Sequence, residues 1–497
     1  MFIRNSLSII NKRTIQGIIP ASYKMNVYSN FPCSNIVYLK LNGRNMDILR
    51  YLDRKKVEKP LRDELFNVEQ LIQHAKQLAA TEHVAKRKKD HFLLDRLDYN
   101  DKILHKFNKD TLLLKRPSTL PPASKWLVDN FYIIEEYIQL ARRHFPEKYS
   151  KELPCHESGE YKGLPRVYSI ILELISHVDA QVEKESLHAF IHAYQTISPL
   201  NLGELWAVPI MLRLALIENL QRIVSRLQQN QIDRNTAKIW VDKLQDMTKK
   251  RPSRLIEVVA DMAKANIPLS RSFVSEFCQR LSSQNPMLHI ARRWLEQRLA
   301  EEGLSIEELI NIDGQSQAAD QLSVSNSISS LRTLGVTDWK VFVESLSIVE
   351  STLRKDPANI YSLMDFSTRD HYRHMIEKIA RDNSISEVKV AEKVISLAKE
   401  ANIQQAEELK SHVGFYLIGD GQTTLNIAFA GKESFSSIIT KTIQRFPLAF
   451  YGGTITLFTL IGGGSLLTIL KSRGISFDSW ESIALSIIFL LLSLIHI

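Results

Sequence analysis

The chain contains 497 residues, which is enough for two to four domains and a sizeable hydrophobic core. Charged residues make up 24% of it, and the formal net charge of +9 is a mild excess with no nucleic-acid recognition motif beside it, so no nucleic-acid partner is expected. The three cysteines, Cys33, Cys155 and Cys278, are far apart and odd in number, which excludes a disulfide framework and a Cys-x-x-Cys site.

Residues 1–46 contain no Asp or Glu but six Lys or Arg residues. A basic, acid-free leader without a compact apolar core is not a secretory signal. We expect residues 1–46 to be a basic disordered extension. An organellar transit peptide, which has a similar composition, stays open as an alternative.

Residues 47–310 are predicted to form a helical domain. Apolar residues recur at helical spacing from about residue 63, beginning with Leu65, Val68, Leu71, Ile72 and Ala75. The segment 200–227 is apolar around almost its whole circumference, interrupted by Glu204, Arg213 and Glu218, which indicates a helix in the middle of a bundle. Further helices are expected at 232–248, 253–265, 270–283 and 287–302.

A polar, Ser- and Gln-rich stretch, 311–328, is predicted to be a linker. A second helical block, 329–445, follows it. Within this block Gly414, Gly419 and Gly421 flank short β-prone runs, so a small Gly-rich hairpin is expected there.

The carboxyl-terminal residues 446–497 are predicted to form a transmembrane helical hairpin. Residues 446–470 are 25 in a row without a charge, bounded by Arg445 and Lys471, and this is long enough to cross a bilayer. The final fifteen residues span only about 22 Å as a helix, against a hydrocarbon core of about 30 Å, so the second helix is expected to be truncated. The expected fold class is thus an all-α cytoplasmic bundle followed by a membrane hairpin.

Candidate histidine sites are better explained by structural roles. His188 and His192 are four residues apart, as in a zinc protease pair, but Ala189 stands where the catalytic Glu is needed. His371 and His374 lie among charged residues, and we expect them on a partly exposed polar face with ion pairs.

Other patterns are equally unspecific. The carboxylate pairs Glu135/Glu136 and Asp98/Asp101 carry no weight alone, and the glycines of "GDGQ" (419–422) are too few for a dinucleotide site. There is no phosphate loop, no nucleophile elbow and no Asp-x-Asp metal motif. The sequence therefore predicts no catalytic, cofactor-binding or metal-binding residue in this chain.

Several strings resemble the amino-terminal region of the bacterial cyclic β-1,2-glucan synthases, over roughly residues 60–470. They are "WLVDNFYIIEEYI" (126–138), "ELPCHESGEYKGLPRVYSIILELISHVD" (152–179), "LNLGELWAVPIMLRLALIENLQRI" (200–223), the stretch 338–380 and "SHVGFYLIGDG" (411–421). Residues 1–46 fall outside the resemblance.

The resemblance implies a very large enzyme of the bacterial inner membrane. In that family a helical amino-terminal region precedes membrane helices and a cytoplasmic glycosyltransferase domain that uses UDP-glucose and a divalent metal. It implies that this chain ends before the transferase domain, so its catalytic residues lie beyond Ile497. "ARRWLEQ" (291–297) has Arg293-Trp294 of the family's Gln-x-x-Arg-Trp motif, but Ile290 stands where Gln is needed.

Two functions follow as hypotheses. The first is a non-catalytic, membrane-anchoring part of a cyclic glucan synthase, with its helical domain in the cytoplasm. Its partners would be the lipid bilayer and a downstream catalytic domain or other membrane helices. The alternative is an independent membrane-anchored helical scaffold that binds a protein partner or anionic lipid, for which the basic excess is the motive.

Overall fold

The chain divides into two compact units, Met1–Leu346 and Ser347–Ile497, in a computed structural model. The structure describes residues 60–429 with short gaps at 83, 86–91, 114–119, 147–148, 150–151, 160, 266, 282–285 and 404–407, together with 26–28, 38–41, 44–47, 450–455, 461–462, 464–465 and 468. The described part is all-α apart from a few short strands, as the periodicity predicts.

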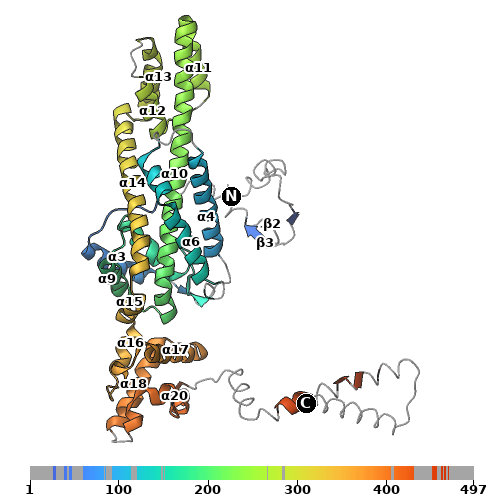
Figure 1. Ribbon diagram of the computed structural model, residues 1–497, viewed down its shortest axis with the longest axis vertical. Helices are drawn as coiled ribbons and strands as arrows, with labels where there is room; N and C mark the ends of the chain where they lie inside the picture. Colours follow the sequence, from blue (N-terminus) through green and yellow to red (C-terminus); the bar gives the residue numbers. More distant parts are fainter. Residues whose placement is uncertain are drawn as a thin grey trace, which may run out of the picture. The chain divides into compact units, whose positions relative to one another are not determined.

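The first unit is built around one very long helix, α10 (Leu202–Lys250), drawn in green in Figure 1. Its 49 residues correspond to a length of about 70 Å. The sequence predicts a break between 227 and 232, but the helix continues through it. A capping box starts the helix, because Asn201 accepts a hydrogen bond from the Glu204 amide and Glu204 accepts one from the Asn201 amide.

The other helices of this unit pack along α10, where α4, α6 and α14 are its neighbours and α11, α12 and α13 gather at its carboxyl-terminal half (Figure 1). Their bounds are α3 (Val68–Thr81), α4 (Phe92–Leu112), α5 (Pro122–Asp129), α6 (Phe131–His144), α8 (Arg166–His177), α9 (Lys184–Gln195), α11 (Leu255–Lys264), α12 (Arg271–Leu281), α13 (His289–Glu301), α14 (Ile306–Val336) and α15 (Trp339–Leu346), with 3-10 turns η3 (Pro252–Arg254) and η4 (Pro286–Leu288).

Two hydrophobic clusters share α10. The amino-terminal half contributes to a core with α3, α4, α5, α6, α8, α9, α14 and α15, and the carboxyl-terminal half packs against α11, α12, α13 and the start of α14. Leu212, Leu216 and Leu220 are completely buried, which explains why this half of α10 is apolar on all sides.

Two carboxylates of α10 are buried in the first core. The Glu204 side chain has no exposed surface and receives two hydrogen bonds from Arg166 of α8, at 2.8 and 2.5 Å. Glu218 is 1% exposed and pairs with Arg222 one turn along and with Arg96 of α4. Because an unpaired buried charge is strongly destabilising, these ion pairs hold α4 and α8 at fixed positions along α10.

The predicted linker 311–328 is wrong, because these residues lie inside the 31-residue helix α14. Four of its polar side chains, Asp313, Asp320, Ser323 and Ser327, are buried and have polar partners. Asp313 contacts Arg234 and Ser272, Asp320 pairs with Arg226, and Ser323 and Ser327 accept hydrogen bonds from Asn219. The polarity that suggested a linker is the surface with which α14 binds α10.

The second unit contains α16 (Ile348–Leu353), η5 (Tyr361–Leu363), α17 (Phe366–Asn383), α18 (Glu387–Ile403), η6 (Glu408–Ser411), α19 (Val413–Leu417) and α20 (Gln422–Phe429). Glu350 is 1% exposed here and contacts Arg373, Arg354 and the Tyr361 hydroxyl. The predicted Gly-rich hairpin is wrong. Gly414 lies in α19, and Gly419 and Gly421 lie in the tight turn between two short helices, where their nearest neighbours belong to Phe415.

Short strands interrupt the extension predicted to be disordered. β1 (Asn26–Tyr28), β2 (Tyr38–Leu41) and β3 (Arg44–Asp47) pair in an antiparallel sheet of that order. Leu41 is opposite Arg44, and the sequence between them is Asn42-Gly43, the dipeptide typical of two-residue hairpin loops. A second pair, β4 (Val84–Ala85) and β5 (Cys155–His156), joins the end of α3 to the segment before α8.

The predicted membrane hairpin, 446–497, lies almost entirely outside the described residues. Residues 450–455 are helical. Within the part of the chain that the structure describes, no helix is both long and apolar enough to span a bilayer.

The two glycines of α14 test whether this segment is a helix packed against the core. A Cβ at Gly314 would meet no atom within 4 Å, so Gly314→Ala is expected to stabilise the protein by about 0.5–1 kcal/mol. A Cβ at Gly335 would lie 2.6 Å from the Tyr137 hydroxyl of α6, so Gly335→Ala is expected to destabilise it by about 1–3 kcal/mol. Urea unfolding of the full chain, followed by circular dichroism, measures both. Equal effects of the two substitutions would contradict the placement of α14.

Candidate functional site

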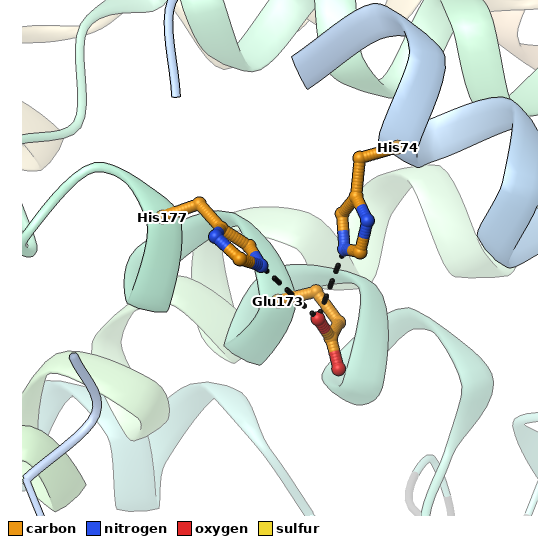
Figure 2. A group of neighbouring side chains, drawn as sticks. All are labelled: His74, Glu173 and His177. Carbon is orange, nitrogen blue, oxygen red and sulfur yellow. Dashed lines mark hydrogen bonds and ion pairs between the residues drawn. The ribbon is translucent and has the colours of Figure 1, made fainter. Parts of the chain in front are cut away.

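Helices α3 and α8 bring together two histidines and a carboxylate, His74, Glu173 and His177 (Figure 2). Glu173 and His177 are one turn apart on α8, and His74 faces them from α3. A capping box formed by Asn67 and Gln70 fixes the start of α3. Packing of α3 against α8 and α9 therefore brings His74 to two side chains about a hundred positions later in the sequence.

The ligand atoms of the three residues converge. His74 Nε2 lies 3.0 Å and His177 Nε2 lies 3.7 Å from the same oxygen, Glu173 Oε2, and all three atoms are within 4.8 Å of one another. Figure 2 shows both imidazole rings directed at this carboxylate, His74 from α3 and His177 from α8.

Contacts around the group fix its orientation. The remaining ring nitrogen of His177, Nδ1, is 2.7 Å from the backbone carbonyl oxygen of Glu64, to which it donates. The Tyr161 hydroxyl donates to the other carboxylate oxygen, Glu173 Oε1, at 2.7 Å. The Phe66 ring stacks on His177 with centroids 3.9 Å apart.

The chain before α3 completes this arrangement. The amides of Asp63 and Phe66 donate to the carbonyl oxygens of Ser176 and His177, at 3.0 Å each. They satisfy carbonyl groups at the carboxyl end of α8 that have no partner within the helix. The group is only partly open to solvent, since the side chains of His74, Glu173 and His177 are 24%, 19% and 8% exposed.

A second polar cluster lies deeper, next to the Arg166–Glu204 pair. His156 Nε2 is 2.6 Å from Ser169 Oγ and 3.6 Å from Glu82 Oε1, and the Tyr194 hydroxyl donates to the other Glu82 oxygen at 2.5 Å. Burial raises the pKa of Glu82, whereas burial and the positive charge of Arg166 lower the pKa of His156.

This deeper cluster is not a nucleophilic triad. In a triad the acid contacts one ring nitrogen of the histidine and the nucleophile contacts the other. Here Ser169 and Glu82 both face Nε2, and Ser169 has no exposed surface through which a substrate could reach it. The cluster therefore connects α3, β5, α8 and α9 and has no access for catalysis.

The two histidine pairs noted in the sequence lie elsewhere, on α9 and on α17. The rings of His188 and His192 are stacked 6.1 Å apart on α9, with Phe342 against His188. His371 and His374 are exposed on α17, and His374 Nδ1 is 3.5 Å from Asp370.

Three of the four carboxylates noted in the sequence contact a basic side chain. Asp98 and Asp101 both contact Arg142, at 2.9 and 2.6 Å, and Glu135 lies 3.6 Å from His105. Trp294, of the Arg-Trp dipeptide, packs against the core of α10, α11, α12 and α13.

The group of His74, Glu173 and His177 is not predicted from the sequence. A Glu and a His four residues apart on a strongly helical segment are a signal, since both side chains then share one face. Nothing in the sequence links them to His74, which is 99 residues away from Glu173. Only the packing of α3 on α8 reveals the third ligand.

The fold and the comparison with known proteins together indicate which proteins this chain is related to. Fold and side-chain contacts define an all-α assembly in which the buried carboxylates Glu204, Glu218 and Glu350 are paired with arginines and the contact between His156 and Ser169 is closed to solvent. No family model matches the chain. It is 30% identical over 357 residues to the cyclic beta-(1,2)-glucan synthase NdvB of Rhizobium meliloti (strain 1021).

The chain is therefore related to the cyclic β-(1,2)-glucan synthases, as its sequence strings predict. The alignment covers 71% of this chain but only 12% of the relative. The similarity thus concerns a small part of a much longer protein.

The deeper cluster makes the stability of the fold depend on pH. Because the pKa of His156 is lowered in the folded state, the unfolded chain binds a proton more readily, and stability is lost as pH falls below the unfolded value of about 6.5. Substitution His156→Gln is expected to reduce the loss of unfolding free energy between pH 8 and pH 5.5. Urea unfolding of the full chain at both pH values measures it. The control is substitution of exposed His289 by Gln. If the His156→Gln variant loses as much unfolding free energy between pH 8 and pH 5.5 as the wild type does, His156 is not the source of the pH dependence.

Proposed function

We propose that this chain is the amino-terminal helical region of a cyclic β-1,2-glucan synthase. In the whole enzyme, a transferase domain would polymerise glucose from UDP-glucose at the bacterial inner membrane. The relationship to NdvB carries the proposal. The strings that resemble the family supply both partners of the central ion pair, Arg166 and Glu204, so the related part coincides with the core of the first unit.

The role proposed for the region is mechanical. A helix of 49 residues, with buried ion pairs to its neighbours, resists bending and holds the packed helices in register. Such a scaffold can hold a catalytic domain at a fixed position at the membrane without taking part in chemistry. We therefore propose that residues 60–429 support the transferase and do not themselves bind UDP-glucose.

The uncharged run 446–470 and the run 483–495 are proposed to anchor the region in the bilayer. Positive residues flank the first run, which is long enough to cross a bilayer. Under this proposal the helical domain lies on the cytoplasmic side of the bilayer.

Membrane fractionation of bacteria that express the full chain tests the proposal. The wild type is expected in the carbonate-washed membrane fraction. The double substitution Ile461→Arg and Ile488→Arg is expected to release it, because an Arg at the centre of a membrane helix costs about 2.5–3.5 kcal/mol. Incubated with UDP-glucose, wild-type membranes are expected to make no more glucan than membranes without the chain.

The matched control places two Arg residues at exposed apolar positions outside these runs, Ile256→Arg and Leu363→Arg, whose side chains are 66% and 86% exposed in the wild type. This variant is expected to stay with the membranes. Release of both variants, or of neither, would contradict the anchor. Glucan synthesis by the chain alone would contradict the non-catalytic role.

A further inference from the structure

We propose that His74, Glu173 and His177 form a binding site for a divalent transition-metal ion, with Zn²⁺ as the best match. The site would join the start of the helical region, residues 61–66 and α3, to the end of α8. The inference rests on the geometry of the three side chains and does not depend on the function proposed above.

Spacing of the donor atoms fits one small ion. Ligands bound about 2.1 Å from a tetrahedral ion lie roughly 3.4 Å apart. The two nitrogen–oxygen distances here are 3.0 and 3.7 Å, and no pair of donors exceeds 4.8 Å. Small rotations of the His74 and Glu173 side chains, both partly exposed, are enough to close the remaining gap.

The hydrogen bonds around the site favour a cation between His177 and Glu173. Because His177 Nδ1 donates to the Glu64 carbonyl, a neutral His177 has only a lone pair at Nε2. That lone pair faces the carboxylate oxygen of Glu173 at 3.7 Å, so one acceptor is directed at another. A metal ion between His177 Nε2 and Glu173 Oε2 would accept a coordinate bond from each atom.

The same hydrogen bonds resemble those that support known metal ligands. A metal-bound histidine commonly donates its other N–H to a backbone carbonyl or carboxylate, and a metal-bound carboxylate is itself hydrogen-bonded. Glu64 provides the carbonyl for His177, and the Tyr161 hydroxyl holds the carboxylate of Glu173. Phe66, stacked on the His177 ring, further limits its rotation.

Donor chemistry selects the class of metal. Two imidazole nitrogens and one carboxylate oxygen suit Zn²⁺ and related transition-metal ions, whereas Ca²⁺ and Mg²⁺ prefer oxygen ligands throughout. Three protein ligands leave a fourth position for water. The 24% exposure of His74 provides the solvent access through which the ion and that water could enter.

Zinc titration of the full chain, purified with a chelator and then freed of it, tests the site. Isothermal titration calorimetry is expected to show one tightly bound Zn²⁺ per chain, and bound Co²⁺ is expected to give the visible absorption of a tetrahedral ion. Glu173→Gln keeps the size of the side chain and an acceptor for Tyr161. Glu173→Gln and His74→Gln are each expected to weaken zinc binding more than about 10-fold, because loss of a residue that merely supports a metal ligand already costs about that much affinity.

The matched control is the double substitution His188→Gln and His192→Gln, which removes two histidines four residues apart on α9, the spacing of Glu173 and His177 on α8. It is expected to bind zinc as the wild type does. Circular dichroism establishes that each variant is folded. The proposal is overturned if the wild type binds no zinc, or if the variants at 74 and 173 bind zinc as tightly as the control.

Discussion

The structure depends on carboxylates buried along α10 and on the arginines that neutralise them. Glu204 and Glu218 have almost no contact with water, and each is held by arginines from α8, from α4 or from α10 itself. A buried ion pair adds little net stability compared with apolar packing, but an unpaired charge is strongly disfavoured. A shift of α8 or α4 along α10 would separate the charges. These pairs therefore fix the positions of α4 and α8 along α10 more than they add to total stability. In the second unit, buried Glu350 is likewise paired with arginines.

Strings that carry the family resemblance contain Arg166, Glu204, Glu218 and Glu350, and all four charged residues form ion pairs in the interior of the fold. His74, Glu173 and His177 differ from them. His74 and Glu173 are partly exposed, His177 is buried, and both histidine rings contact one carboxylate oxygen.

The sequence predicts the class of fold well and its connections poorly. Helical spacing and the apolar segment 200–227 correctly indicate an all-α bundle with a central helix. The linker prediction for 311–328 failed because the buried face of α14 is made of Ser and Asp, whose partners on α10 and α12 are distant in sequence. Likewise the spacing of Glu173 and His177 could be read from the sequence, but His74 joins them only through tertiary packing. Composition alone also overlooked the strands on either side of Asn42-Gly43.

A double-mutant cycle on Arg166 and Glu204 tests the central claim most directly. The full chain and the variants Arg166→Met, Glu204→Gln and the double variant are compared by urea unfolding. If the pair sets the register of α8 on α10, each single substitution is strongly destabilising and the double variant recovers part of the loss, with a coupling energy above about 1 kcal/mol. Additive effects, with a coupling energy near zero, would show that the two charges do not depend on each other and would contradict the account.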